Sequence, residues 1–312
     1  RLAEYAAAGA ATLGGEHDVS DWYAGGSLGV ATTITPEPDD PIQNEVRTIT
    51  GLAKLPDGRT RIGLNGPLNF AHQGSGDFHA EVGLLTRNVL FTTELVGPGA
   101  PSETELQAQV RLRKFAHTMY MEGGQGHNQY TEYKYMGHYG KLGRYPTHHH
   151  RSLELSRGQV VRGNGYWYSG FRAVNLHVAR GVTVEDNVAY SCQSTPYFVE
   201  EDKALGPARD HVFVHNLSVE ALRKHFNDRS NDAVPGEFYR LGGFWPGQNT
   251  FNEAFLGNVA VGHGNRSGTG SGAFSFPEIT GGRDTGGLIP FTFVANQGHG
   301  DMVDEAEEAA PN

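Results

Sequence analysis

The chain has 312 residues, a formal net charge of −10 and a single cysteine, Cys192. The acidic balance argues against general nucleic-acid binding, which needs a basic footprint, and one cysteine excludes an internal disulfide framework. No apolar run approaches the roughly 18 residues of a membrane-spanning helix. Glycine accounts for 43 residues without a triplet period, which excludes collagen. Abundant Gly, Asn, Thr, Val and aromatic residues favour short strands joined by tight turns.

Four regions are expected in chain order. Residues 1–45 hold an Ala/Gly stretch and Thr-Pro turns and predict an irregular N-terminal arm with one strand or short helix. Residues 46–95 predict a β-rich entry region, and 96–300 the main β domain. Residues 301–312 hold five acids and no base, which is typical of a solvated tail. Because the chain starts at Arg1, we expect part of a longer protein.

A weak internal repeat runs through the main domain. Each copy is a short β-type run, an Asn and a second β-type run. Spacings of 23 and 29 residues separate Asn164, Asn187 and Asn216, which suits one coil of a parallel β-helix. Asn88 and Asn258 mark further copies. We expect these asparagines at turns that need φ > 0, with side chains that hydrogen-bond from coil to coil. A β-sandwich with chance Asn-Val pairs is the alternative.

The segment 134–180 is basic within an acidic chain. It holds eight Lys or Arg and one acid, Glu154. Such a block can focus a positive field on an anionic ligand. Equally, its charges can be spread around the outside of successive coils, with no function.

Histidines gather in the same segment. In a strand, His148 and His150 project to one side and His149 to the other. Residues one coil apart stack about 4.8 Å apart, so we expect a surface column built from three coils. Its members are His148 and His150, then Asn175 and His177, then Glu200 and Asp202, with His72 and His79 approaching from an earlier coil.

Two chemistries fit this column, and the alternative is that the histidines are turn or stacking residues. His148, His150 and His177 could bind one divalent metal ion, which is the cofactor considered. Alternatively, imidazole and carboxylate could divide acid and base duties. The catalytic candidates are His150, His177, Glu200 and Asp202, and the substrate-binding candidates are Arg144, Arg172, Tyr145 and Asn175. Two glycosylation sequons begin at Asn216 and Asn265.

One motif is specific to a known family. The run Gly137-His-Tyr-Gly-Lys-Leu-Gly-Arg-Tyr-Pro-Thr-His-His-His150 resembles the "MGQ…GRYPIHFH" signature of the cell-migration-inducing, hyaluronan-binding protein family. That family includes a transmembrane cell-surface hyaluronidase relative and fibrocystin-like proteins. The resemblance continues through Phe171–His177 and Gly181–Tyr190, and residues 80–88 resemble the end of the family's eight-glycine domain.

The resemblance implies an all-β fold, a right-handed parallel β-helix, in an extracellular protein that binds or cleaves glycans. It carries over Arg144, His148, His150, Arg172 and His177 as matching positions. The family's "GHAFFLEDG" motif is replaced by Gln193-Ser-Thr-Pro-Tyr-Phe-Val-Glu-Glu-Asp202, which keeps the acids and loses the His. If cleavage needs that His, the protein binds glycan without cutting it.

The predicted function is recognition of an acidic polysaccharide of hyaluronan type at the cell surface or outside the cell, with cleavage of glycosidase or lyase type left open. The alternative is a non-catalytic structural or adhesive building block of a fibre or matrix, which would self-assemble. Neither nucleic acid nor a membrane span is expected.

Overall fold

The computed structural model describes residues 1–34, 43–76, 78–93, 102, 115–139, 141–202, 204–223, 242–247, 250, 252–262, 264–265, 274 and 291–299. Within these ranges the regular structure is β, apart from one 3-10 turn, η1 (Glu154–Ser156). The expected acidic tail, 301–312, lies outside the described residues. In the described part of the chain, no helix has the length and apolar character needed to span a bilayer.

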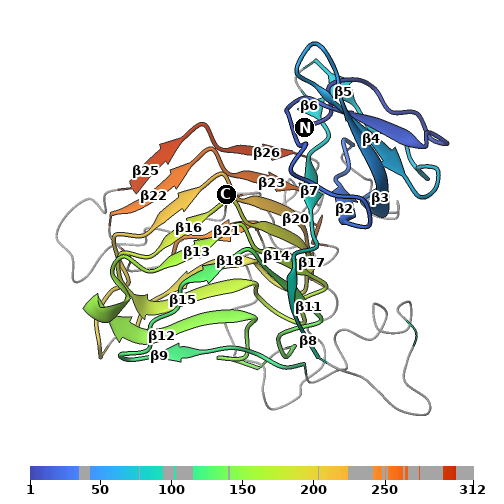
Figure 1. Cartoon of the computed structure of the whole chain (residues 1–312). Coiled ribbons are helices and arrows are strands. Elements are labelled where there is room, and N and C mark those ends of the chain that lie inside the picture. The colour runs from blue at the N-terminus through green and yellow to red at the C-terminus, as the bar shows by residue number, and fades with distance from the viewer. Residues whose placement is uncertain are drawn as a thin grey trace, which may run out of the picture.

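The N-terminal residues form an antiparallel sheet, which is blue in Figure 1. The sheet has the order β1-β4-β3-β2-β7. Its strands are β1 (Thr12–Gly15), β2 (Ser27–Val30), β3 (Glu45–Lys54), β4 (Thr60–Leu64) and β7 (Val82–Leu84). A separate hairpin pairs β5 (Gly74–Ser75) with β6 (Phe78–His79).

The expectation of an irregular arm at 1–45 is therefore wrong for its described residues. β1 pairs with β4, and β2 pairs with β3 and β7, so both strands are part of the sheet formed with the entry region. The glycines that weaken the β signal have a packing role. A Cβ atom on Gly29 would lie 2.9 Å from the Tyr190 ring, and one on Gly83 would lie 2.8 Å from Val188. Only glycine lets the sheet approach these side chains so closely.

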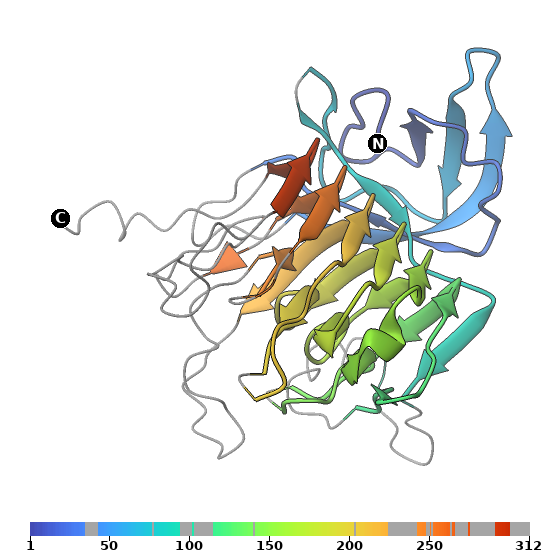
Figure 2. The same ribbon diagram turned by 90° about the vertical axis from the view of Figure 1, so that its left-hand side faces the viewer.

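The rest of the described chain is a parallel β-helix of three sheets, as predicted (Figures 1 and 2). The first sheet holds β10 (Asn128–Gln129), β13 (Val160–Arg162), β16 (Thr183–Glu185), β19 (Val212–Val214), β22 (Glu253–Leu256) and β25 (Phe291–Val294). The second holds β8 (Val89–Thr92), β11 (Thr131–Lys134), β14 (Gly165–Trp167), β17 (Val188–Cys192), β20 (Leu217–Arg223), β23 (Val259–Val261) and β26 (Gln297–His299), with β24 (Gly264–Asn265) beside β20. The third holds β9 (Tyr120–Met121), β12 (Thr147–Leu153), β15 (Val174–Ala179), β18 (Tyr197–Glu200) and β21 (Phe244–Trp245).

Inward side chains of successive coils stack on one another to form the core. The ring centroids of Tyr133 and Tyr166 are 4.9 Å apart, and those of Phe213 and Phe255 are 4.8 Å apart. These spacings follow the separation of about 4.8 Å between paired strands. Each coil therefore buries its apolar side chains against the coils above and below it.

A ladder of asparagines runs along the turn between the first and second sheets. The Oδ1 atom of Asn187 accepts from the backbone N–H and the Nδ2 of Asn164, at 3.0 and 2.9 Å. The same pattern links Asn187 to Asn216, Asn216 to Asn258 and Asn258 to Asn296. The predicted coil-to-coil hydrogen bonds are confirmed. Asn88 also lies at a turn, directly before β8, but it is exposed and outside this ladder.

The predicted reason for these asparagines is wrong. The residue with positive φ is the one before each ladder Asn: Gly163 (65°), Asp186 (55°), His215 (51°) and Gly257 (62°). The asparagines have another role, because each buried amide both accepts hydrogen bonds from a neighbouring coil and donates to one. Their selection at the turn follows from hydrogen bonding and not from backbone strain.

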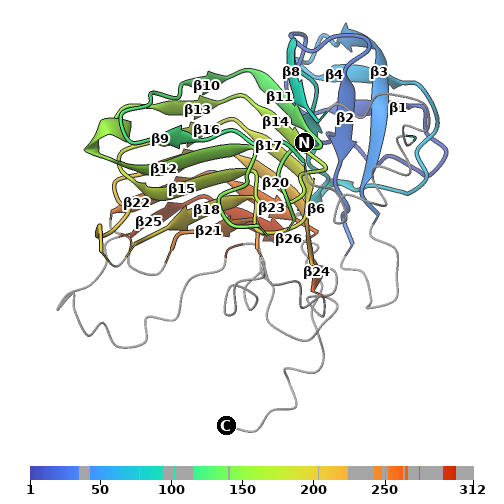
Figure 3. The same cartoon turned by 90° about the horizontal axis from the view of Figure 1, so that it is seen from below.

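The N-terminal sheet packs against the outer face of the second β-helix sheet (Figure 3). A buried apolar cluster joins them, with Ala31 and Leu85 on one side and Trp167, Tyr190, Leu217, Val219 and Val261 on the other. The outer face of the third sheet, which holds the histidines, is a different surface.

Candidate metal and polysaccharide site

Three neighbouring strands of the third sheet carry the predicted column. His150 is in register with His177, and His177 with Glu200. His148 is in register with Asn175. His149 lies on the opposite, inward side of β12, where it is fully buried with its ring centroid 5.1 Å from that of Tyr120. Strand alternation therefore sorts the three consecutive histidines as expected.

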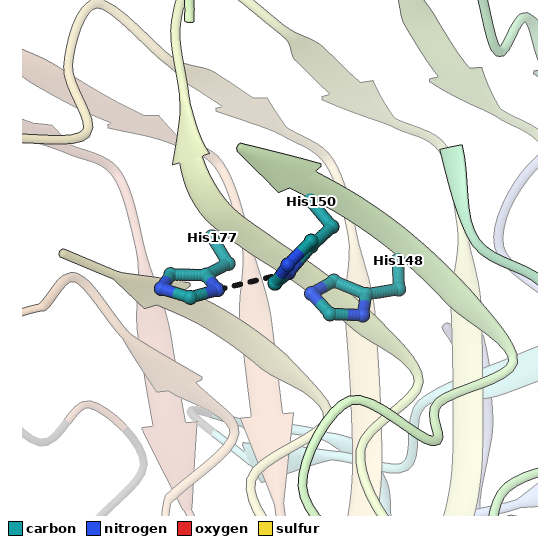
Figure 4. A group of neighbouring side chains, drawn as sticks. All are labelled: His148, His150 and His177. Carbon is teal, nitrogen blue, oxygen red and sulfur yellow. Dashed lines mark hydrogen bonds between the residues drawn. The ribbon is translucent and has the colours of Figure 1, made fainter. Parts of the chain in front are cut away.

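His148, His150 and His177 form a compact cluster (Figure 4). Each offers one ring nitrogen, and these three atoms all lie within 4.8 Å of one another. The Nδ1 atoms of His150 and His177 are 3.1 Å apart. The ring centroids of His148 and His150 are 4.9 Å apart.

His148 is held in one tautomer by the backbone. Its Nδ1 lies 3.2 Å from the carbonyl oxygen of Gly143. A carbonyl only accepts, so Nδ1 carries the proton and Nε2 has a free lone pair. Nε2 is buried and has no hydrogen-bond partner among the described residues. Figure 4 shows this side of the ring directed toward His150.

Burial favours the neutral form of His148 and of His150. Desolvation, followed by the neighbouring His150, lowers the pKa of His148 to about 2. Desolvation, followed by His177, also lowers the pKa of His150. A neutral imidazole is the form that binds a metal ion.

These residues fit a divalent transition metal. Three nitrogen donors within a few ångströms, one of them a buried atom without a partner, suit zinc, copper, iron or nickel better than the oxygen-seeking magnesium or calcium. The carbonyl that fixes the tautomer of His148 is the kind of outer contact that orients a metal-binding histidine.

Glu200 is anchored beside this cluster by buried partners. Its Oε2 accepts from Arg172 and from Asn175, both at 3.2 Å. The Arg172 guanidinium also donates to the Tyr145 hydroxyl, and it lies 3.4 Å from the centroid of the Phe198 ring. Arg172, Tyr145 and Asn175 are each at most 1% exposed.

The expectation that these three buried residues contact substrate is therefore not supported by their positions. Arg172 instead connects two coils through its contact with Glu200. Sequence reasoning missed Phe198. It lies two residues before Glu200 in β18, on the same face of the strand, and its ring stacks against the Arg172 guanidinium.

Two other candidates lie at the rim. Asp202 forms an ion pair with Arg151 at 2.5 Å and is outside the register that joins His177 to Glu200. Arg144 is partly exposed. After burial, the Arg144 charge is the next cause that lowers the pKa of His117. After burial, the charges of His177 and Arg151 lower the pKa of His150, and the Asp202 charge acts weakly in the opposite direction. Arg144 is available at the surface.

His72 and His79 do not join the column. His72 is fully buried in the N-terminal part of the chain, where it contacts Glu45 at 2.8 Å and the carbonyl oxygen of Ala31. His79 contacts the carbonyl oxygens of Leu2 and Gly76. The expectation that they approach the cluster is wrong, because residues 72–79 belong to the N-terminal sheet region and not to a coil.

The basic block is largely neutralised by acids from adjacent coils. Five of its eight cations form ion pairs: Arg151 with Asp202, Arg157 with Glu154 and Asp210, Arg162 with Glu185, Arg172 with Glu200, and Arg180 with Glu154. This arrangement favours the alternative in which the charges are spread around successive coils, where most of them pair with acids. The described residues of segment 134–180 therefore do not present a continuous, strongly positive surface.

The two sequons differ. Asn216 is 1% exposed and belongs to the asparagine ladder, so its side chain is inaccessible to a glycan in the folded protein. The expectation of glycosylation there is wrong. Asn265 lies in β24, and its side chain is outside the described part.

Comparisons with known proteins agree with this fold. Residues 115–265 match the family model described as CEMIP beta-helix. A G8 domain-containing protein from Dictyostelium discoideum is 28% identical over 84% of this chain and 21% of its own length. Fibrocystin-L from Mus musculus is 28% identical over 77% of this chain and 6% of its own. The cell surface hyaluronidase of Danio rerio is 26% identical over 65% of this chain and 15% of its own length.

The chain thus spans about a fifth or less of these relatives. The match includes the 137–150 motif and the three histidine-bearing and acid-bearing strands of the site. The resemblance identified from the sequence is confirmed, because residues 115–265 of this chain match the CEMIP beta-helix family model.

Proposed function

We propose that the protein is an extracellular, metal-dependent polysaccharide-cleaving β-helix whose substrate is an acidic polysaccharide of hyaluronan type. The observation that carries the proposal is the buried, partner-free Nε2 of His148 beside His150 and His177. Buried polar atoms are normally satisfied, so an unpaired nitrogen in a cluster of imidazoles calls for a ligand.

The three histidines would hold the ion. Three protein ligands leave a coordination position open, which is typical of catalytic and not of structural zinc sites. When bound, the ion supplies a Lewis acid for an oxygen of the substrate or of water.

Glu200 would act as the proton acceptor beside the cluster. Its Oε2 is fixed by Arg172 and Asn175, which sets the direction of the carboxylate. Its other oxygen, Oε1, accepts no hydrogen bond from the described residues and is free to receive a proton. Arg172 and Asn175 therefore position Glu200 and do not touch the polymer.

The choice of substrate follows from the relatives and from the surface cations. The chain is similar to a protein named cell surface hyaluronidase, and that likeness also supports the extracellular location. Arg144 is partly exposed, and the side chain of Arg151 is 48% exposed although it is paired with Asp202, so both guanidinium groups can be reached from solvent. A polymer with one carboxylate per repeat would meet such scattered cations without needing a continuous basic surface.

The test is depolymerisation of high-mass hyaluronan by chelator-treated protein, with and without added Zn²⁺, Cu²⁺ or Ni²⁺. Chain length is measured by size-exclusion chromatography, and uncharged dextran is the polymer control. We expect hyaluronan, but not dextran, to shorten only when metal is present. His150→Asn should abolish shortening, whereas His17→Asn, at an exposed histidine, should not.

Other outcomes would contradict the proposal in distinct ways. Salt-dependent hyaluronan binding without shortening would show recognition alone. Neither binding nor shortening would favour the structural or adhesive building block.

A further inference from the structure

A groove lies where the N-terminal sheet meets the turns of the β-helix, away from the histidine cluster. It has a volume of about 750 Å³. One wall holds Asp21, Trp22 and Tyr23, from the segment before β2, and the other follows the turns beside the asparagine ladder. No residue of the histidine cluster lines it.

The turn wall presents a row of side chains on left-handed backbone. Tyr130 (φ 53°), Asp186 (φ 55°) and His215 (φ 51°) occupy equivalent positions in their coils. The intervening position in the row is Gly163. A Cβ atom there would lie 2.6 Å from the Tyr130 ring, so this glycine lets the ring lie against the next coil.

These side chains are open to solvent. Tyr130 is 60% exposed, and the side chains of Asp186 and His215 are 58% and 69% exposed. Across the groove, Tyr23 is exposed and its hydroxyl is 3.0 Å from the Oγ1 atom of Thr86. Two tyrosines therefore face solvent in a concave surface that also holds carboxylates. Aromatic rings with one polar end suit ligands with both an apolar face and hydroxyl groups.

The charge of the groove argues against a polyanion. Arg87 is a lining cation, but its guanidinium donates to the carbonyl oxygens of Gly163, Leu84 and Thr86. Glu81 is paired with Arg1. Asp21 is exposed, and Asp186 is also exposed while one of its oxygens lies 3.9 Å from Nδ1 of the lining residue His215. Carboxylates repel other carboxylates while accepting hydrogen bonds from hydroxyls.

We infer that this groove binds an uncharged oligosaccharide. A sugar ring stacks on Tyr130, and neighbouring hydroxyls of the sugar donate to the carboxylate of Asp186. The site is separate from the histidine cluster and takes a ligand of different charge. The protein therefore binds a neutral glycan segment at the seam between its N-terminal sheet and its coils.

The experiment measures binding of cellotetraose, maltotetraose and chitotetraose by isothermal titration calorimetry to the unaltered protein and to two groove variants. Tyr130→Asn and Asp186→Asn are chosen because Asn tolerates positive φ, so the turn is kept while the ring or the charge is removed. Tyr5→Ala, at an exposed tyrosine outside the groove, is the control. Thermal melting checks that every variant is folded.

At least one tetrasaccharide should bind the unaltered protein and Tyr5→Ala equally. Tyr130→Asn and Asp186→Asn should each raise its Kd at least fivefold. Absence of binding to all three sugars, or binding that both groove variants retain, would overturn the inference. So would tight binding of decalysine that the groove variants lose, because that result identifies a peptide site.

A hyaluronan tetrasaccharide serves as the acidic comparison and should not bind in the groove. The outcome is independent of the proposed function, since His150→Asn removes the metal site and leaves every groove residue in place.

Discussion

The Nδ1 atoms of His150 and His177 lie 3.1 Å apart on adjacent strands that are in register. At that distance two lone pairs repel each other, so the pair must share a proton or a cation. The spacing is set by the sheet, because directly paired residues of neighbouring coils are held together by the backbone. The histidine pair is thus preorganised before any ligand arrives.

Replacing either member of this pair should remove metal binding. We expect the unaltered protein to retain about one Zn²⁺ per chain after dialysis, and His150→Asn and His177→Asn to lose it, because two ligands bind far more weakly than three. Plasma mass spectrometry gives the metal content. His17→Asn should match the unaltered protein, and a variant of the pair that keeps stoichiometric zinc would disprove the site.

Replacing Arg172 should destabilise the folded protein, whereas replacing Arg144 should leave its stability almost unchanged. Arg172→Gln leaves the anchored Glu200 without its buried cation and should lower the free energy of unfolding by about 3 kcal/mol. Arg144→Gln, at a partly exposed position, should change it by less than about 0.5 kcal/mol. Urea unfolding followed by circular dichroism measures both. Equal, small effects would mean that Arg172 is not a structural tie.

The asparagine ladder should be a main contributor to stability. Asn187→Ala removes hydrogen bonds to Asn164, Asn216 and the Val161 carbonyl, and leaves buried partners unpaired. The expected loss is about 3 kcal/mol or more, since unmade buried hydrogen bonds are costly. Asn88→Ala, at an exposed copy of the repeat, is the control and should be nearly neutral.

Much of the coil pattern could be predicted from sequence, because it depends on local spacing. The asparagines recur once per coil, and alternation along one strand separates His149 from its neighbours. The burial of Arg172 could not be predicted in the same way, because its partners Phe198 and Glu200 come from the next coil. Register between coils of unequal length is a property of the fold and not of any single segment.

The strands of the N-terminal sheet that lie within residues 1–45 were not placed from sequence, for a related physical reason. β2, with the sequence Ser27-Leu-Gly-Val30, has a weak intrinsic strand signal, and its partners β3 and β7 lie far along the chain. Strand formation there depends on non-local pairing and on packing against Tyr190.

The sequon at Asn216 should remain unmodified in folded protein secreted from eukaryotic cells. Its side-chain amide is buried and donates to the Val184 carbonyl and to Asn258, at 2.8 and 2.9 Å. An attached glycan would break both bonds. Mass spectrometry of the peptide that contains Asn216 tests this, and a glycan found there in folded material would contradict the ladder.

Stability should fall as the pH rises through the neutral range. Burial raises the pKa of Glu253 well above its usual 4.5, so the folded state keeps a proton that the unfolded state releases. Above about pH 6.5 unfolded histidines are neutral, so the buried His211, whose pKa desolvation lowers to about 3, no longer opposes this trend.

The expected slope is up to about 1.4 kcal/mol per pH unit from Glu253, until the pH reaches its folded pKa. Glu253→Gln should flatten the slope above pH 6.5 in urea unfolding, whereas Glu122→Gln, at an exposed glutamate, should keep it. An unchanged slope in Glu253→Gln would show that Glu253 is ionised in the folded protein.

The apolar cluster beneath the N-terminal sheet has a consequence for how the molecule opens. In a plain solenoid each coil contacts only its neighbours, so the stack can fray one coil at a time. Here the sheet covers Trp167, Tyr190, Val219 and Val261, which come from four successive coils. Separating any of these coils also exposes the underside of the sheet. Amide protons of β14, β17, β20 and β23 should therefore exchange in one cooperative event, and the most protected part of the molecule should be the covered flank and not the middle of the stack.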